Sequence, residues 1–248
     1  MLSREAVYQE ILQGLPDWDA YLLQESGLPG PRGNLELAKV VADLGDLRRF
    51  EQFLTFTPDI APTNDPHEFL AFCGVVGLGR LAAEGQTELV ARLRRYASDP
   101  RWRLREATAM ALQRVGMVDM TLLLAITRDW ALGSWYEKRA AAAALAEPVL
   151  LKDPRIVSQV LDLFDQITTA VAQAEDHKAQ DFRVLRQALG YAWSVVVAAD
   201  PAAGKLRLER WLSNDDPDIR WVMRENLKKN RLVKMDANWV AIWSAKIE

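Results

Sequence analysis

A seven-residue unit recurs along this 248-residue chain at an almost constant interval. In its fullest form a basic residue is followed by small residues and, seven positions after the base, by a large apolar residue, as from Arg105 to Leu112. The last residues of the successive units are Leu44, Leu78, Leu112, Leu145, Trp193 and Leu227, at spacings of 34, 34, 33, 48 and 34. Such a period is typical of solenoids whose repeat is a pair of helices.

The pattern inside each unit is helical. Leu104, Ala107, Ala111 and Leu112 fall at i, i+3, i+7 and i+8, which places them on one face of a helix. Alanines let neighbouring helices approach closely, and the large anchor fills the space between them. No sustained alternation of apolar and polar residues indicates strands. The sequence therefore predicts an all-α fold of about six helical-pair repeats.

The remaining segments divide the chain. Residues 1–33 are expected to form an N-terminal helical cap, with two helices broken near Pro16, and residues 34–248 a single continuous repeat domain that ends in a cap containing Trp239 and Trp243. Asp-Pro pairs such as Asp99-Pro100 are expected to open helices, because Asp caps free N–H groups and Pro suits the first turn. Partner helices are predicted over residues 87–96, 119–130, 154–174 and 202–212. Loops are predicted over 28–34 and 57–66, and an insertion over 162–181.

The bulk composition excludes several classes of function. With 31 basic and 34 acidic side chains the net charge is −3, so no global field draws the chain to nucleic acid or to an anionic membrane. Cys73 is the only cysteine, which rules out an internal disulfide. The longest apolar run, residues 69–79, is too short to span a bilayer, and no secretory signal is visible. We expect a cytoplasmic protein without membrane contact.

Side chains that carry chemistry are sparse. His67, His177 and Cys73 match no metal-ligand spacing, and two histidines in such places supply no base for a nucleophile. The glycines at 74, 77 and 79 lack the strand and the Lys-Ser or Lys-Thr of a phosphate loop, so we expect them to serve close helix packing. We therefore expect no metal, no cofactor and no catalytic residue.

Basic and aromatic residues form the most suggestive cluster. Over residues 92–105 six arginines, at 92, 94, 95, 101, 103 and 105, oppose one acid, Asp99. Residues 201–235 carry a local net charge of +4, and residues 1–70 carry −7. Such residues either contact phosphates, bases or a peptide, or they pair and pack internally. The candidates for binding are Arg103, Arg139, Arg183, Arg224, Trp102, Trp135 and Trp221, and the four arginines are predicted to be exposed on the concave face.

The repeat pattern resembles HEAT repeats over about residues 34–232. Longer strings also resemble an uncharacterised group of bacterial HEAT-repeat proteins; they are FLAFCGVVGLG at 69–79, RVLRQALGY at 183–191 and DIRWVMRENLKK at 218–229. The resemblance implies a right-handed α-solenoid whose second helices line the concave side. It implies no particular activity.

A second resemblance covers three short stretches. Some HEAT-like solenoids are DNA glycosylases that remove alkylated purines with aromatic, acidic and arginine side chains on the concave face. The segment from Trp135 to Arg139 is similar to their arginine-bearing segment, and Trp102 and Glu106 stand where a tryptophan and an aspartate would stand. Glu106 departs from the expected aspartate.

Three functions remain open at this point. The first is a non-enzymatic scaffold that binds another protein through the concave face. The second is a nucleic-acid-binding protein, with glycosylase chemistry as its enzymatic version, which requires a positive groove containing Arg103, Arg139 and Arg183. The third, a chaperone-like or lyase-type HEAT protein acting on a cofactor-bearing partner, is permitted by the resemblance alone.

Overall fold

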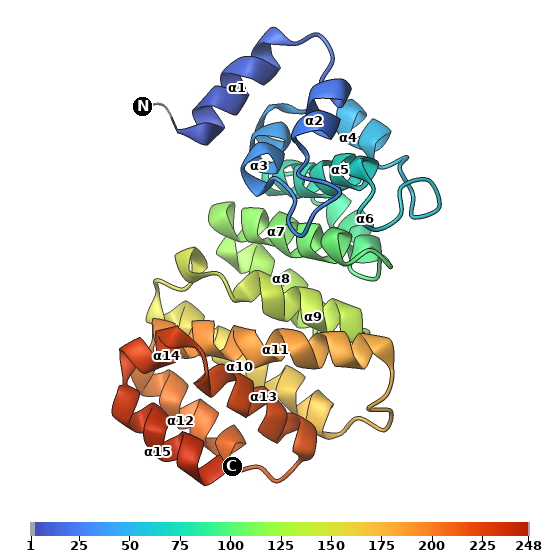
Figure 1. The fold of residues 1–248 in the computed structure, drawn as a ribbon. Helices are drawn as coiled ribbons and strands as arrows, with labels where there is room; N and C mark the ends of the chain where they lie inside the picture. The colour runs from blue at the N-terminus through green and yellow to red at the C-terminus, as the bar shows by residue number, and fades with distance from the viewer. Residues whose placement is uncertain (1–2, 248) are drawn as a thin grey trace. The chain divides into compact units, whose positions relative to one another are not determined.

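The computed structural model describes residues 3–247. In that part of the chain all regular secondary structure is helical, with fifteen α-helices and one short 3₁₀-helix and no strand, which confirms the predicted all-α class (Figure 1). The chain divides into two compact units, which we call unit 1, ending at Asp119, and unit 2, beginning at Met120.

Unit 1 contains seven helices. They are α1 (Arg4–Gly14), α2 (Asp19–Glu25), α3 (Leu35–Leu44), α4 (Leu47–Phe53), α5 (Pro66–Ala83), α6 (Leu89–Tyr96) and α7 (Trp102–Val118). Helix α5 packs between α3 and α7, with α4 and α6 also against it. Near its start α5 meets the start of α7 through Glu68 and Arg103, and further along Gly79 meets Ala111. Helices α5 and α7 are therefore parallel neighbours.

Two glycines of α5 make this packing possible. A Cβ on Gly79 would lie 2.4 Å from the Cα of Ala111, and one on Gly77 would lie 2.4 Å from the ring of Phe50. Since real Cβ atoms do not approach so closely, both positions require glycine for close helix contact. The predicted packing role of the glycines is confirmed.

Unit 2 contains the remaining helices. They are α8 (Met120–Trp130), α9 (Trp135–Leu145), η1 (Pro148–Leu150), α10 (Pro154–Ala172), α11 (Gln180–Ala199), α12 (Pro201–Leu212), α13 (Pro217–Leu227), α14 (Asn230–Met235) and α15 (Ala237–Ile247). Helix α11 packs between α9 and α13, while α10 and α12 pack against α11 and against each other (Figure 1). The predicted partner helices are present, with ends within two residues of those expected.

Capping Asp side chains followed by proline mark the starts of four helices. Asp65, Asp153, Asp200 and Asp216 each accept a backbone N–H with the side chain, and each is followed by proline. The Asp99 side chain likewise accepts the backbone N–H of Arg101, at 2.8 Å, and binds its guanidinium, as Asp153 does with Arg155. Helix α7 nevertheless begins at Trp102, two residues after Pro100, so Asp99-Pro100 does not open the helix directly as predicted.

The repeat anchors are internal. Leu78, Leu112, Leu145, Trp193 and Leu227 are buried, as the repeat pattern requires, and only Leu44 is half-buried. The insertion consists of the second half of α10 and the loop 173–179, as predicted. Cys73 is a buried core residue of α5. Within residues 3–247, no helix combines the length and the apolarity needed to cross a bilayer.

Candidate functional site

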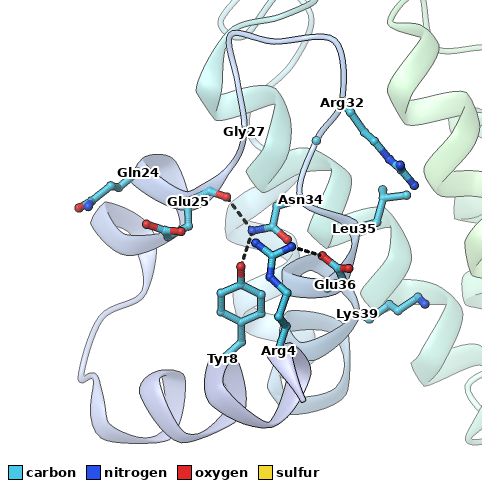
Figure 2. A pocket seen from close by; sticks show the side chains of 11 residues that line it. Arg4, Tyr8, Gln24, Glu25, Gly27, Arg32, Asn34, Leu35, Glu36 and Lys39 are labelled. Atoms are coloured by element: carbon cyan, nitrogen blue, oxygen red, sulfur yellow. Dashed lines mark hydrogen bonds and ion pairs between the residues drawn. The ribbon is translucent and has the colours of Figure 1, made fainter. Parts of the chain in front are cut away.

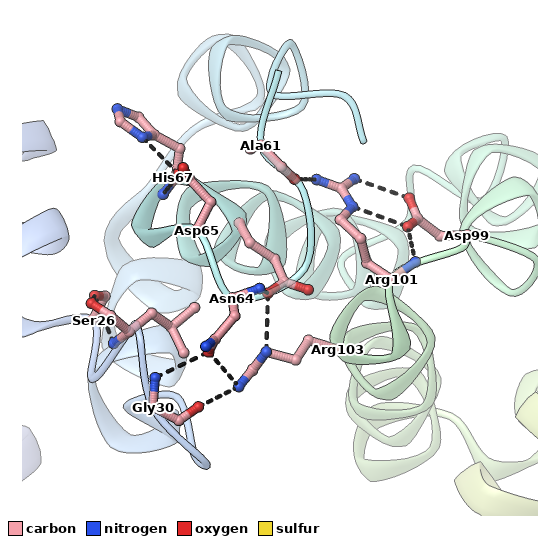
Figure 3. A network of polar contacts seen from close by, with 11 residues as sticks. Ser26, Gly30, Ala61, Asn64, Asp65, His67, Asp99, Arg101 and Arg103 are labelled. Atoms are coloured by element: carbon pink, nitrogen blue, oxygen red, sulfur yellow. Dashed lines mark hydrogen bonds and ion pairs between the residues drawn. The ribbon is translucent and has the colours of Figure 1, made fainter. Parts of the chain in front are cut away.

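Half of the arginine cluster of unit 1 is internal: Arg101, Arg103 and Arg105 are buried, whereas those at 92 and 94 are half-buried and the one at 95 is exposed. Figure 3 shows Arg101 and Arg103 at the start of α7, reaching two irregular segments of unit 1, residues 26–34 and 54–65. Arg101 forms a two-pronged ion pair with Asp99, with 3.0 and 2.9 Å contacts, and donates to the carbonyl oxygens of Phe56 and Ala61 at 2.8 and 3.0 Å. Arg101 thus fixes the loop before α5.

Arg103 fixes the second segment. Its guanidinium lies 3.1 Å from the carboxylate of Glu68, whose side chain is fully buried, and donates to the carbonyl oxygen of Gly30 at 2.6 Å (Figure 3). It also contacts the side-chain oxygen of Asn64 at 3.3 Å, and the backbone N–H of Asn64 donates to Glu68 at 2.8 Å. Arg103 therefore joins α5, α7 and both loops.

The prediction that Arg103 and Arg139 are exposed is wrong. Arg103 is 5 % exposed and Arg139 is 7 % exposed. For Arg103 the reason is the buried carboxylate of Glu68 and the carbonyl of Gly30, which replace water around the guanidinium. Neither arginine offers its charge to solvent.

The segment similar to the glycosylase arginine segment has a local structural role. Ser134 and Glu137 form a reciprocal capping box at the start of α9, with contacts of 3.3 and 2.5 Å. Trp135 packs edge-on against Phe182, with ring centroids 5.5 Å apart. The ammonium group of Lys138 lies over the Trp135 ring and bonds to the carbonyl of Gly133; burial lowers its pKa, against the opposing charge of Glu137.

Trp102 stands at an apolar pocket of unit 1. The indole is 44 % exposed, and one face is covered by the Arg103 guanidinium, 4.5 Å from the ring centroid. The pocket has a volume of about 270 Å³ and exposes mainly carbon. Its lining consists of Arg32, Gly33, Leu35, Phe69, Phe72, Trp102, Arg103, Glu106 and Met110. Of the candidate residues, the structure brings Trp102 and Arg103 together here.

A polar pocket adjoins the apolar one. It has a volume of about 600 Å³ and shares Arg32, Gly33 and Leu35 with it. Figure 2 shows Asn34 in the polar pocket, donating to the Tyr8 hydroxyl at 3.0 Å and to the carbonyl of Glu25 at 2.9 Å. Arg32 is exposed and forms no ion pair with any residue between 3 and 247.

The other candidates lie in unit 2. Trp221 of α13 is half-buried against Gly190, with the Arg186 guanidinium 4.1 Å from its ring centroid. Arg183 of α11 and Arg224 of α13 are exposed, as predicted. Because α11 and α13 are in contact, these candidates belong to one layer of helices. Among the described residues, no three His, Cys, Asp or Glu side chains are grouped so as to hold a metal ion.

Sequence reasoning missed most of the pocket lining. Phe69 and Phe72 lie in a run of apolar residues where no periodicity distinguishes the pocket face from the core face. Arg32 lies in a loop rich in Gly and Pro, whose path the sequence does not define. Trp102, Arg103 and Glu106 are the lining residues that the sequence analysis did single out.

The comparisons with known proteins supply no relative. No family model, no curated protein and no solved structure matches the chain.

Proposed function

We propose that this chain is a HEAT-type α-solenoid that acts as a non-enzymatic protein-binding scaffold, and that the apolar pocket beside Trp102 anchors a large apolar side chain of the partner. The observation that carries the proposal is an exposed indole held in place by a buried arginine at the edge of an apolar pocket. Exposed, rigid tryptophans are typical centres of protein interfaces.

The solenoid part of the proposal is supported within each unit. Helices α5 and α7 run parallel in unit 1. In unit 2, Trp221 and Asn226 of α13 meet α11 at Gly190 and Ser194, so these helices are parallel as well. Equivalent helices of successive repeats are parallel neighbours in a solenoid, and the buried anchors at intervals of about 34 residues fit this arrangement.

The rigidity of Trp102 favours binding. The Arg103 guanidinium that covers its ring is held by Glu68 and by the carbonyl of Gly30, so the indole has a fixed support. A side chain that is already ordered loses little conformational entropy on binding. Trp102 therefore combines large contact area with a low cost of ordering.

The size of the pocket indicates the kind of ligand. Sites for whole drug-sized molecules begin at roughly 300 Å³, and this pocket, at about 270 Å³, fits a single large side chain better. The adjoining polar pocket offers Arg32 and the polar groups around Asn34 to a peptide main chain. A partner segment with a Phe, Trp, Leu or Met side chain fits the two pockets together.

The same geometry disfavours nucleic acid as the partner of this site. Phosphate contacts require accessible cations. Arg103 and Arg139, which the nucleic-acid hypothesis requires in a positive groove, are buried. The pocket exposes mainly carbon, which suits an apolar side chain.

A peptide-display selection tests the proposal. Random peptides would be selected on the full chain, without any selection on the Trp102→Ala variant. We expect the enriched peptides to share one large apolar residue. Their affinity for Trp102→Ala, measured by fluorescence anisotropy, should be lower by about tenfold or more, as for a residue at the centre of an interface.

Ile60→Ala is a matched control, because Ile60 is also an exposed apolar residue of unit 1 and lies outside both pockets. It should bind the selected peptides as the natural chain does. Selected peptides that bind equally well to Trp102→Ala, or that share no apolar residue, would contradict the proposal.

A further inference from the structure

Unit 2 carries a basic face that the site in unit 1 does not involve. Residues 224–235 hold five bases and one acid, Glu225, a local net charge of +4. We define the basic face as these five bases together with Tyr191; the bases are Arg224, Lys228, Lys229, Arg231 and Lys234. The bases lie on α13, on α14 and between them, and Tyr191 lies on α11, which contacts both helices.

The charges of this face are accessible. Arg224, Lys228 and Lys234 are exposed. Lys228 bonds to Glu225 at 2.5 Å, whereas Arg224 and Lys234 form no ion pair within residues 3–247. A carboxylate from outside would meet unpaired cations here without displacing an internal partner.

Tyr191 orders part of the face. Its ring is 48 % exposed, its hydroxyl accepts a hydrogen bond from Arg231, and the Arg231 guanidinium lies 4.8 Å from the ring centroid. The ammonium of Lys229 lies 5.9 Å from the same centroid. The two cations are thus held on one side chain, so less rotamer entropy is lost when an anion binds them.

An apolar pocket lies beside the cations. It has a volume of about 240 Å³, lies between α13 and α15, and is lined by Arg224, Leu227, Lys228, Ser244 and Ile247. Leu227 and Ile247 are almost fully buried, whereas Arg224 and Lys228 are exposed. The accessible carbon of the pocket is therefore supplied mainly by the aliphatic stems of Arg224 and Lys228, so one ligand can place an apolar side chain against these stems and carboxylates on their charged ends.

We propose that the basic face and this pocket bind an acidic, extended protein segment that carries one large aliphatic side chain. The pocket favours such a segment over nucleic acid, because its carbon lining is aliphatic, whereas nucleobases stack on aromatic rings. Each nearby aromatic ring already has a cation against it: Arg186 lies over Trp221, Lys246 over Trp243, and Lys229 and Arg231 over Tyr191.

This proposal is independent of the site at Trp102. It involves only residues of unit 2, and a Trp102→Ala variant should leave it unchanged. Failure of one proposal is therefore distinguishable from failure of the other.

The experiment uses the full chain and three fluorescein-labelled probes. The first is a ten-residue peptide of Asp and Glu with one central Leu, the second replaces that Leu by Ser, and the third is an oligothymidylate. Anisotropy would be measured at about 50 mM and about 200 mM salt, since contacts between exposed charges weaken with ionic strength.

We expect the Leu peptide to bind more tightly than the other two probes and to lose affinity at the higher salt. The double variant Arg224→Glu/Lys228→Glu should reduce its affinity by about tenfold or more. Ser244→Trp, which fills the pocket without altering charge, should reduce the affinity for the Leu peptide towards that for the Ser peptide.

A matched reversal controls for net charge and folding. Lys152 and Arg155 are exposed bases of unit 2 that belong neither to the basic face nor to the pocket lining, and Lys152→Glu/Arg155→Glu should bind as the natural chain does. The neutral double variant Arg224→Gln/Lys228→Gln should also lose affinity. No binding of the Leu peptide at low salt, equal binding by the two reversal variants, or tighter binding of the oligothymidylate would overturn the proposal.

Discussion

Two basic segments of this chain look alike in sequence and differ in where their charges lie. Residues 92–105 of unit 1 hold six arginines and one acid, and residues 224–235 of unit 2 hold five bases and one acid. In unit 1 the arginines at 101, 103 and 105 are buried, whereas in unit 2 Arg224, Lys228 and Lys234 are exposed. Base density alone therefore does not identify a binding surface.

The difference lies in what surrounds each segment. The start of α7 faces two irregular segments whose carbonyl oxygens are not used in helices, at Gly30, Phe56 and Ala61, and these accept from Arg101 and Arg103. Arg105 in turn donates to the carbonyls of Asp99 and Pro100. The bases of unit 2 lie on and between helices whose carbonyls are largely satisfied internally, so their charges remain in water.

The largest loss of unfolding free energy, and the strongest test of this contrast, is expected for Arg103→Ala. Removal of the guanidinium leaves the fully buried carboxylate of Glu68 without its charge partner. An uncompensated buried charge costs about 3 to 5 kcal/mol of unfolding free energy. Urea denaturation of the natural chain and the variant measures the loss.

The double variant Arg103→Leu/Glu68→Leu is the informative companion. With both charges removed, the loss should be clearly smaller than that of Arg103→Ala, because no buried charge remains. A loss for Arg103→Ala below about 1 kcal/mol would mean that water or another cation reaches Glu68, and the contrast with unit 2 would weaken.

Arg101→Ala is expected to have the next largest effect. It removes the ion pair with Asp99 and the two hydrogen bonds to the loop before α5, at an expected cost of about 2 to 3 kcal/mol, since bonds to charged groups are the strong ones. Limited proteolysis should show earlier cleavage within residues 54–65. Cleavage at the natural rate would show that the loop is held by other contacts.

The sequence predicted the helices and their core packing better than it predicted the surfaces. The repeat anchors, the partner helices and the close-packing glycines follow from local periodicity and residue size, which helical geometry translates directly into packing. The start of α7 lies at Trp102 and not at Pro100, although Asp99 makes the same bonds to Arg101 that Asp153 makes to Arg155 at a helix that begins at its proline.

For the apolar pocket, the sequence analysis correctly selected Trp102 as a binding candidate but wrongly predicted that Arg103 is exposed. Trp102 is exposed at the pocket, but Arg103, expected to be exposed for binding, is buried as its support. The buried partner Glu68 is 35 residues away in sequence, and Gly30 is 73 residues away. Contacts across such separations depend on how the helices pack, which the spacing of the repeats does not specify.

A smaller effect on stability is expected from the ionisation of Cys73. Because Cys73 is the only cysteine and lies in unit 1, its thiol is a probe of that unit alone. Burial raises the pKa of its thiol well above the ordinary value, so the folded chain keeps the thiol neutral. The contribution of this pKa shift to the unfolding free energy is fully present below the thiol pKa of the unfolded chain, roughly 8.5. It is lost as the pH rises towards the higher thiol pKa of the folded chain.

The measurement compares the natural chain with Cys73→Ala in urea as a function of pH. Above roughly pH 8.5, the stability of the natural chain should fall relative to the variant by about 1.4 kcal/mol per pH unit. Native thiol labelling should be slow and should accelerate in Arg103→Ala. Parallel pH profiles for the two proteins would show that Cys73 is accessible to solvent, and hence that the interior of unit 1 is open.

The smallest effect is expected in unit 2, and it completes the contrast. Arg224→Ala and Lys228→Ala remove bases that are exposed, and Lys228 loses only a surface ion pair with Glu225. Each change should alter the unfolding free energy by no more than about 0.5 kcal/mol. If either variant instead lost about 2 kcal/mol or more, its base would have a structural role like that of Arg103. The basic face would then be part of the internal framework of unit 2, and exposure would no longer separate the two basic segments.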